Sequence, residues 1–375
     1  MIKSLHIHNF KCFKDEKFEL RPLSIFCGQN GVGKSSAIQT LLLIREVSSA
    51  SHNGNFVRLN GPFLLELGTV ADIFRNNADD KSIEFIIEND NENKFSWKFP
   101  ADNTSEDLYL LLEEMPSECP SCFISNETSA FTYICADRLG PQDIQNIQST
   151  PIETSQVGVQ GEFTADVLVK HGRDEVRKPL KYPYINGNTE RSKFLDRQIE
   201  YWMQELIPGI EIQCQSFSDA NISTIRLKKG AKSEWLRPTN MGFGVSHSLP
   251  IIVAGLLCPP ESLFIVDSPE SHLHPAAQAN MARFLATLAA GGVQIIIETH
   301  SDHIINGIRL AAIDDHPLKR SDVIIHNFYM DSNNSVKVSP IEITATGSLS
   351  KWPENFLDQT EKDLTAIYEA RKKNE

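Results

Sequence analysis

The stretch LSIFCGQNGVGKSSAIQTLLLIREV, Leu23–Val47, decides the fold. A short apolar run comes first, a glycine-rich loop follows, and apolar residues then recur with helical spacing from Ile38 onward. Gly28 to Ser35 reads G-x-x-x-x-G-K-S, a spacing in which backbone N–H groups surround phosphate oxygens and the helix N-terminus adds a positive dipole. A glycine-rich turn of purely structural use is the alternative. The strand before the loop and the helix after it favour a phosphate-binding loop.

The residue types in this loop have distinct expected roles. Lys34 is expected to reach the β- and γ-phosphates, and the Ser35 hydroxyl to bind Mg²⁺. Glycines remove side chains where the backbone must approach oxygen. The predicted nucleotide-binding residues of the loop are Gly28, Asn30, Gly31, Val32, Gly33, Lys34, Ser35 and Ser36.

Several motifs together resemble one family. The opening, LHIHNFKCF followed by LSIFCGQNGVGKSS, resembles the start of RecF, SMC and OLD-type ATPases, in which Asn30-Gly31 is the usual variant of the loop. YICADRLGPQ (Tyr133–Gln142) and VGVQGEFTADVL (Val157–Leu168) resemble internal motifs of the OLD/AAA-21-like branch. GSLSKWPENFLDQ (Gly347–Gln359) resembles the C-terminal signature of a sub-branch whose tail is known only as a domain of unknown function.

This resemblance implies an α/β fold, a P-loop NTPase of the ABC/SMC head type. The implied fold has a mixed central sheet, an N-terminal antiparallel β part and an inserted helical/β lobe. The implied ligands are ATP and Mg²⁺. The expected division is 1–100 for the first part of the head, 101–235 for the inserted lobe, 236–344 for the second part of the head and 345–375 for a tail helix. Residues 101–128 are polar and lack periodicity, which predicts a loop or small insertion.

In this class two copies enclose two ATP molecules, and each copy contributes a signature motif to the other's site. TNMGFGVSHSLPIIVAGLL fits the signature position. Gly242 and Gly244 would allow the backbone to approach a γ-phosphate, and Ser246 would donate its hydroxyl and N–H from a helix start. The spelling departs from the LSGGQ of ABC proteins, and a glycine turn that caps a buried helix is the alternative.

The run LFIV ends in Asp267, where ligands bind at the carboxyl ends of parallel strands. Asp267 is expected to hold Mg²⁺ through water together with Ser35. Ser268 occupies the usual position of the catalytic glutamate and is a poor base, so Glu270 is the nearby candidate. Capping of the following helix by Glu270 is an equal alternative. QIIIETHSDHIINGIR matches the switch-histidine segment, in which His300 would face the γ-phosphate. The predicted catalytic residues are therefore Glu270, His300 and Asp267.

Two weaker signals concern other ligands. Cys119-Pro-Ser-Cys122 is a C-x-x-C that would need further ligands to bind zinc. A basic hairpin is a candidate DNA contact, with a solvated, charge-protected strand edge as the alternative. Its residues are Arg226, Lys228, Lys229, Lys232 and Arg237.

Composition limits the class of protein. The 375 residues are 41% hydrophobic and 23% charged, no apolar run reaches the ~20 residues of a membrane span, and the formal net charge of −13 argues against general coating of nucleic acid. Seven cysteines without a signal peptide indicate reduced thiols and a cytoplasmic location.

The resemblance implies a slow ATPase that dimerises on ATP and controls a separate effector, such as a nuclease, in bacterial antiphage defence. A RecF-like DNA repair ATPase is one alternative. An ATP-stabilised scaffold without significant turnover is another, and it is favoured by Ser268.

Overall fold

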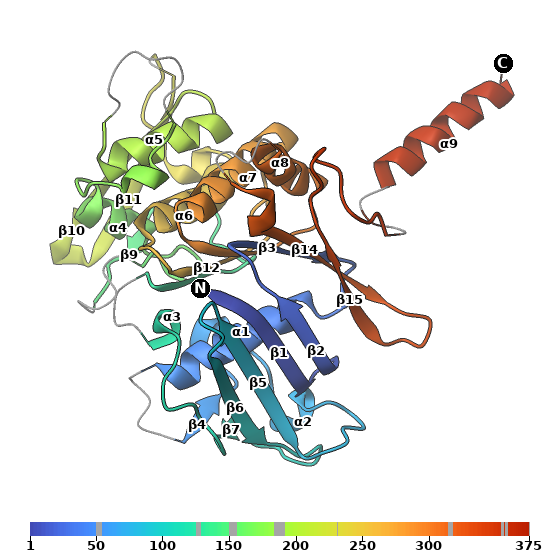
Figure 1. Cartoon of the computed structure of the whole chain (residues 1–375). Helices are drawn as coiled ribbons and strands as arrows, with labels where there is room; N and C mark the ends of the chain where they lie inside the picture. The colour runs from blue at the N-terminus through green and yellow to red at the C-terminus, as the bar shows by residue number, and fades with distance from the viewer. Residues whose placement is uncertain are drawn as a thin grey trace.

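The computed structural model describes residues 1–49, 55–124, 129–149, 156–183, 192–230, 232–313, 318–353, 356 and 359–374. A six-stranded central sheet has the order β15-β14-β3-β13-β12-β8 (Figure 1). Five neighbouring strands are parallel and β15 pairs antiparallel at one edge. The bounds are β3 (Leu23–Gly28), β8 (Phe131–Ile134), β12 (Leu263–Asp267), β13 (Gln294–Glu298), β14 (Val323–Met330) and β15 (Val336–Ile341).

The central strands are apolar throughout because both faces of the sheet are covered. In β13, Ile295 and Ile297 pack into the core on one face, while Ile296 packs into the core on the other. The same alternation separates Ile25 from Phe26 in β3. Continuous apolar runs in the sequence are thereby explained, and the predicted α/β fold with a mixed central sheet is confirmed.

A second sheet covers one face, with α1 between the two sheets. It is antiparallel, in the order β2-β1-β5-β6. The apolar side of α1 shares a core with this sheet and with Phe26, Ile265 and Ile296 of the central sheet. The bounds are β1 (Ile2–Phe10), β2 (Phe13–Glu19), β5 (Ser82–Asn89), β6 (Lys94–Pro100) and α1 (Lys34–Ser48). The expected N-terminal antiparallel part is therefore present.

Helices cover the opposite face of the central sheet, together with a small three-stranded sheet of order β10-β11-β9 (Figure 1). The bounds are α4 (Thr164–His171), α5 (Leu195–Leu206), α6 (Phe243–Leu257), α7 (Pro275–Ala290), α8 (Asp302–Ala312), β9 (Gln145–Asn146), β10 (Ile210–Phe217) and β11 (Ile222–Lys229).

Residues 101–124, expected to begin the inserted lobe, pack at two different places in the fold. Residues 101–128, predicted as loop, contain β7 (Tyr109–Leu111), which pairs with β4 (Phe56–Arg58), and α3 (Ser121–Ile124), which packs beside α1. The polar sequence hides these elements because each is only three or four residues long. After them β8 joins the central sheet, so the division into domains stays a prediction.

The tail has two different parts. Phe356 is buried in the core and the Arg309 guanidinium donates to the Gly347 carbonyl, so the start of the tail packs on the body. The terminal helix α9 (Gln359–Asn374) projects away from it (Figure 1). A further short helix is α2 (Val70–Ile73).

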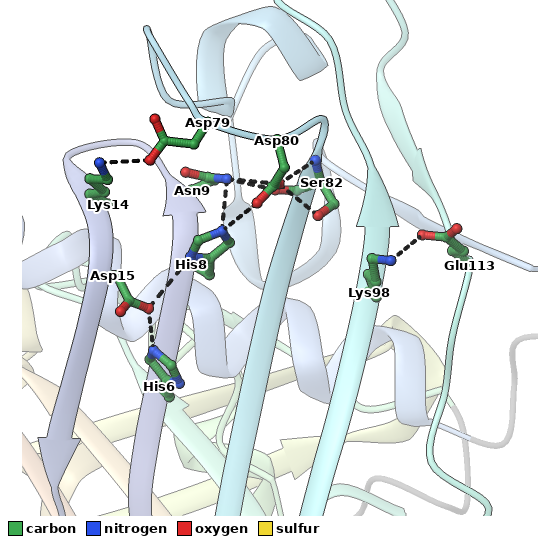
Figure 2. A network of polar contacts seen from close by, with 10 residues as sticks. All are labelled: His6, His8, Asn9, Lys14, Asp15, Asp79, Asp80, Ser82, Lys98 and Glu113. Atoms are coloured by element: carbon green, nitrogen blue, oxygen red, sulfur yellow. Dashed lines mark hydrogen bonds and ion pairs between the residues drawn. The ribbon is translucent and has the colours of Figure 1, made fainter.

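A polar network fixes the turn between β1 and β2 (Figure 2). His6 Nε2 lies 2.6 Å from Asp15 Oδ1 across the strand pair, and His8 Nε2 lies 3.0 Å from Asp80 Oδ2. Asn9 Nδ2 also donates to Asp80. These contacts join β1 to β2 and to the loop before β5, and they hold the turn that contains Cys12 beside the phosphate loop.

Candidate nucleotide site

The glycine loop turns tightly between β3 and α1. Gly28 has φ +130°, and a Cβ there would come within 2.1 Å of the Phe328 carbonyl oxygen of β14. Gly33 has φ +94°, and a Cβ there would come within 2.5 Å of Cys12 Sγ. No side chain caps the start of α1, so its first N–H groups face the loop. Only glycine allows this close packing, and it leaves the helix N-terminus open to an anion.

Lys34 and Ser35 meet a carboxylate that the sequence analysis did not identify. Lys34 Nζ donates to the carbonyls of Gly28 at 3.2 Å and Gln29 at 2.7 Å, and it lies 3.8 Å from Glu298 Oε1. The Ser35 hydroxyl lies 3.1 Å and 3.3 Å from the two oxygens of Glu298. The loop, β13 and the start of α1 therefore converge on one polar site.

Two cavities meet at Ser35. The first has a volume of about 240 Å³ and is the expected place of the phosphates. Its lining comes from the phosphate loop, the turn after β1 and the end of β13, and consists of Cys12, Asn30, Gly31, Gly33, Lys34, Ser35, Ser36, Glu298 and His300. The second, about 380 Å³, lies between α1 and β8 and includes Ser35, Tyr133, Gln160 and Asp267. Val32 does not face either cavity, because it is buried in the core beside α1.

Asp267 ends β12 directly beside Glu298 in the parallel register. Burial, together with the neighbouring Asp267 carboxylate, raises the pKa of Glu298 to about 7. Burial also raises the pKa of Asp267, against the hydrogen bond from the Ser268 hydroxyl to its Oδ1 at 2.9 Å. Two buried carboxylates at adjacent strand ends strongly favour a cation between or beside them.

Arg138 fixes the backbone after β12. Its guanidinium donates to the carbonyls of Cys135 at 2.8 Å, Asp267 at 2.7 Å and Ser268 at 2.6 Å. Ser268 has φ +48°, a conformation that costs free energy in a non-glycine residue. Arg138 thus holds the strained turn that directs the chain from Asp267 towards Glu270.

Glu270 contacts the end of β13. Its two oxygens accept from Thr299 Oγ1 at 2.8 Å and from the His300 N–H at 2.9 Å. It does not cap α7, whose N-terminal side-chain cap is His274. His300 itself is exposed and lines the phosphate cavity. Although part of its side chain is exposed, the side that faces the cavity is desolvated, and this desolvation, followed by the Lys34 ammonium, lowers the pKa of His300, so the imidazole is neutral near pH 7.

The signature candidates lie at the start of α6 and outside the phosphate cavity of their own chain. Gly242 is the N-cap, Gly244 packs against the His272 carbonyl, and Ser246 lies in the first turn. Phe243 is 51% exposed and stacks on His272 with ring centroids 5.1 Å apart. An exposed aromatic ring therefore marks the helix start.

The proposed DNA residues are partly engaged with acids. Lys228 Nζ lies 3.3 Å from Glu211, and Arg237 lies 3.1 Å from Asp143. The remaining members of the group give β11 and the turn after it a positive charge; they are Arg226, Lys229 and Lys232.

The cysteine pair lies against the core beside α1. Cys122 is buried, Cys119 is half-buried, and burial raises the pKa of the Cys122 thiol to about 12. A thiol that stays protonated is a poor zinc ligand. No group of three metal-binding side chains surrounds them in the described ranges.

The donor set at the strand ends fits Mg²⁺. Ser35, Asp267 and Glu298 supply only oxygen atoms, which this hard cation prefers. In the part of the chain that the structure describes, no three His, Cys, Asp or Glu side chains form a metal cage. Mg²⁺ commonly takes one or two carboxylates and completes its shell with water and substrate phosphates, so a site without a cage is compatible with it.

Two residues at the site, Gln160 and Glu298, escaped the sequence analysis. Arg138 did not, because Asp137 and Arg138 of the motif ADRLGP are candidates from the sequence to line either the nucleotide site or a lobe interface. For Glu298 a signal existed, because it ends a buried strand as Asp267 does. For Gln160 the quoted motif that contains it marked a segment but no role.

Comparisons with known proteins bear on the family and on the fold. A family model described as "AAA domain, putative AbiEii toxin, Type IV TA system" matches residues 23–306. A second, described as a protein of unknown function (DUF3696), matches residues 318–367. No curated protein matches the chain.

Solved structures show the same fold. An SMC head bound to the C-terminal winged-helix domain of ScpA has a TM-score of 0.55 at 14% identity, and the alignment covers 91% of this chain and 98% of that one. An SMC head with an extended coiled coil, bound to the C-terminal domain of ScpA and derived from Pyrococcus furiosus, has a TM-score of 0.52 at 14% identity, with 98% and 99% covered. At this identity the likeness establishes the fold alone.

Across the described residues, every helix is too short or too polar to span a membrane.

Proposed function

The chain belongs to the AbiEii-type family of AAA domains, and from that premise we propose that it is an ATP-binding, slowly hydrolysing head that dimerises on ATP and controls a separate effector. The observation that supports this function best is the convergence of Lys34, Ser35, Asp267 and Glu298 at the carboxyl ends of parallel strands. That arrangement offers a phosphate-binding loop and oxygen ligands for Mg²⁺ at the same place.

In this proposal Lys34 and the loop N–H groups bind the β- and γ-phosphates. Mg²⁺, when bound, neutralises charge on the transferred phosphoryl group. Ser35 and Asp267 hold it, Asp267 through water. His300 contacts the γ-phosphate from the first cavity, and Glu270 positions the His300 backbone or accepts the proton of the attacking water.

Dimerisation is supported by the place of the signature candidates. Gly242, Gly244 and Ser246 lie outside the chain's own phosphate cavity, next to an exposed aromatic ring. A second copy would bring these groups to the γ-phosphate. Control of an effector in antiphage defence rests on the family resemblance and on the projecting α9. The solved SMC heads of similar fold are bound to domains of ScpA, which supports the proposal that this chain also docks another protein.

Phosphate release tests the proposal. The parental protein with Mg²⁺ and ATP should turn over slowly, and Lys34→Ala and Asp267→Asn should each lower the rate by ~10²-fold or more because they remove phosphate and metal contacts. Lys81→Ala is a matched control, since Lys81 is exposed and pairs with Asp102 on the outer sheet. Parental turnover in Lys34→Ala would contradict the assigned site.

An ATP-stabilised scaffold is the second candidate. It is favoured by Ser268 in the glutamate position and by the two hydrogen bonds that occupy Glu270. Tight Mg·ATP binding without phosphate release, at any DNA concentration, would support the scaffold. A RecF-like DNA repair ATPase instead requires turnover that rises with DNA, through the basic hairpin at Arg226–Arg237.

A further inference from the structure

Glu298 occupies an unusual place for a carboxylate. It is the last residue of β13, which lies between β3 and β12 in the central sheet. Its side chain is only 7% exposed, and it lines the cavity that the phosphate loop encloses. The same cavity contains the N–H groups and the ammonium that would bind an anion. A buried carboxylate therefore lies inside a site for an anionic ligand.

Glu298 contacts the lysine and the serine of the phosphate loop. Both oxygens lie within 3.3 Å of the Ser35 hydroxyl, and one lies 3.8 Å from Lys34 Nζ. Ser35 is the residue whose hydroxyl is expected to bind Mg²⁺. A cation bound to Ser35 would be close to Glu298 as well, and Asp267 is its neighbour in the register.

Glu270 differs from Glu298 both in its position relative to the phosphate cavity and in its hydrogen-bond partners. It does not line the phosphate cavity, and its two oxygens accept from Thr299 and the His300 backbone. Among the three carboxylates at this edge, Glu298 is the one in contact with the phosphate loop.

We propose that Glu298 is a carboxylate of the Mg²⁺ site, directly or through one water, and that it makes nucleotide binding depend on the metal. This inference rests on the proposed function. Like charges separated by a few ångströms repel strongly in a poorly solvated site, and a divalent cation between them converts repulsion into attraction on both sides. Triphosphate alone is therefore rejected by Glu298, whereas the magnesium complex is accepted.

The test is ATP affinity, measured by calorimetry at pH 8.5 in Mg²⁺ and in EDTA, because the carboxylate is then ionised and binding is read without turnover. For the parental protein we expect Mg²⁺ to tighten binding by about 100-fold or more, the size expected for removing one close charge repulsion. Glu298→Gln should bind ATP more tightly than the parent in EDTA, and its Mg²⁺/EDTA ratio should fall by at least about 10-fold.

Two further variants separate charge from packing. Glu298→Asp keeps the negative charge and should keep the weak binding in EDTA. Glu84→Gln is a matched control, because Glu84 lies in β5 and accepts from Ser96, away from the phosphate loop. Its Mg²⁺/EDTA ratio should equal that of the parent.

The outcomes divide clearly. An unchanged ratio in Glu298→Gln, or a parallel loss of affinity in Mg²⁺ and in EDTA, would overturn the proposal, since a purely structural contact predicts the latter. Tight EDTA binding by Glu298→Asp would overturn it too. A parental protein that binds no ATP under either condition would instead refute the proposed function. Glu298→Ala replaces Glu298→Gln if the latter does not fold, with the same expectation.

Discussion

At the scale of single residues, Glu270 is the carboxylate that we propose to activate the attacking water. Its contacts with Thr299 and the His300 N–H place it one hydrogen bond away from a residue that faces the phosphates. In the protein without nucleotide, the Glu270 carboxylate orients the backbone of His300. In the proposed reaction it accepts a proton from a water that lies within its reach. Both roles require the Glu270 carboxylate for hydrolysis. Neither role contributes to the affinity for ATP.

Glu270→Gln should therefore slow phosphate release by ~10²-fold or more, the usual cost of losing a general base. ATP affinity should stay within about twofold, because Glu270 touches no phosphate-binding residue of the loop. Stopped-flow phosphate release and calorimetry measure the two quantities. A variant that hydrolyses at the parental rate would exclude Glu270 as base and leave His300 with a bound water.

At the scale of elements, the contribution of the first turns of α6 to the stability of the fold should depend on pH. His247 is buried in its second turn, its Nδ1 has no hydrogen-bond partner among the described residues, and its ring lies 4.5 Å from that of His272. Burial, then the charge of Arg138, lowers the pKa of His247 to about 4. The unfolded chain takes up this proton below about pH 6.5 and the folded chain only near pH 4, so acid favours unfolding.

Between pH 6.5 and 4, His247 should lower the free energy of unfolding by up to ~1.4 kcal/mol per pH unit. His247→Phe retains a ring for stacking but cannot titrate, so the difference in stability between variant and parent should grow as pH falls. Urea denaturation at pH 7.0, 6.0 and 5.0 measures it. His303→Phe on α8 is the control, and a difference independent of pH would refute the role of His247.

The tail separates into an anchoring segment and a free helix. Phe356 is 4% exposed and its ring meets that of Trp352 at 5.7 Å, whereas Leu364, Ile367 and Tyr368 of α9 are more than half exposed. Spacing of i, i+3 and i+4 places these three on one face of α9, as in helices that dock into a groove.

Deleting residues 359–375 should leave ATP affinity and the melting temperature near the parental values, because α9 buries little against the body. It should abolish control of the effector. Phe356→Ala should instead destabilise the fold by ~3–5 kcal/mol, as expected for a truncated core aromatic. Calorimetric melting and pull-down of the effector distinguish the two. Equal loss of stability in both variants would contradict the division.

At the scale of the whole molecule, each chain presents its phosphate cavity and its signature candidates at separate places. The γ-phosphate would give the first turn of α6 in a second copy a charged acceptor, which ADP lacks. A ligand shifts a conformational or assembly equilibrium only by its differential affinity for the two states.

ATP with Mg²⁺, but not ADP, should therefore favour a dimer, which light scattering with ATP, ADP and no nucleotide measures. The Glu270→Gln background keeps ATP intact during the measurement. Ser246→Arg should block dimerisation while sparing ATP binding, and Ser117→Arg, at an exposed loop position, is the control. An oligomer that ignores nucleotide would refute the ATP switch and favour the scaffold.

The phosphate loop, the buried strand that ends in Asp267, the segment that contains His300 and the family could all be predicted from the sequence. These features are local: glycine spacing, apolar runs and strand-to-helix order depend on neighbouring residues along the chain. The α/β fold with an N-terminal antiparallel sheet followed from the same patterns and from the resemblance. Short elements such as β7 and α3 had too few residues to produce a period.

Which polar groups meet depends on the packing of segments that are distant in the sequence. Glu298 reaches Ser35 because β13 pairs between β3 and β12, and a pairing of strands about 270 residues apart leaves no trace in either strand's own sequence. Arg138 reaches the turn after Asp267 for the same reason, and Glu270 contacts Thr299 instead of capping α7. Local sequence specifies backbone conformation, whereas the partners of a buried charge are set by the packing of distant segments, which must satisfy every such charge at once.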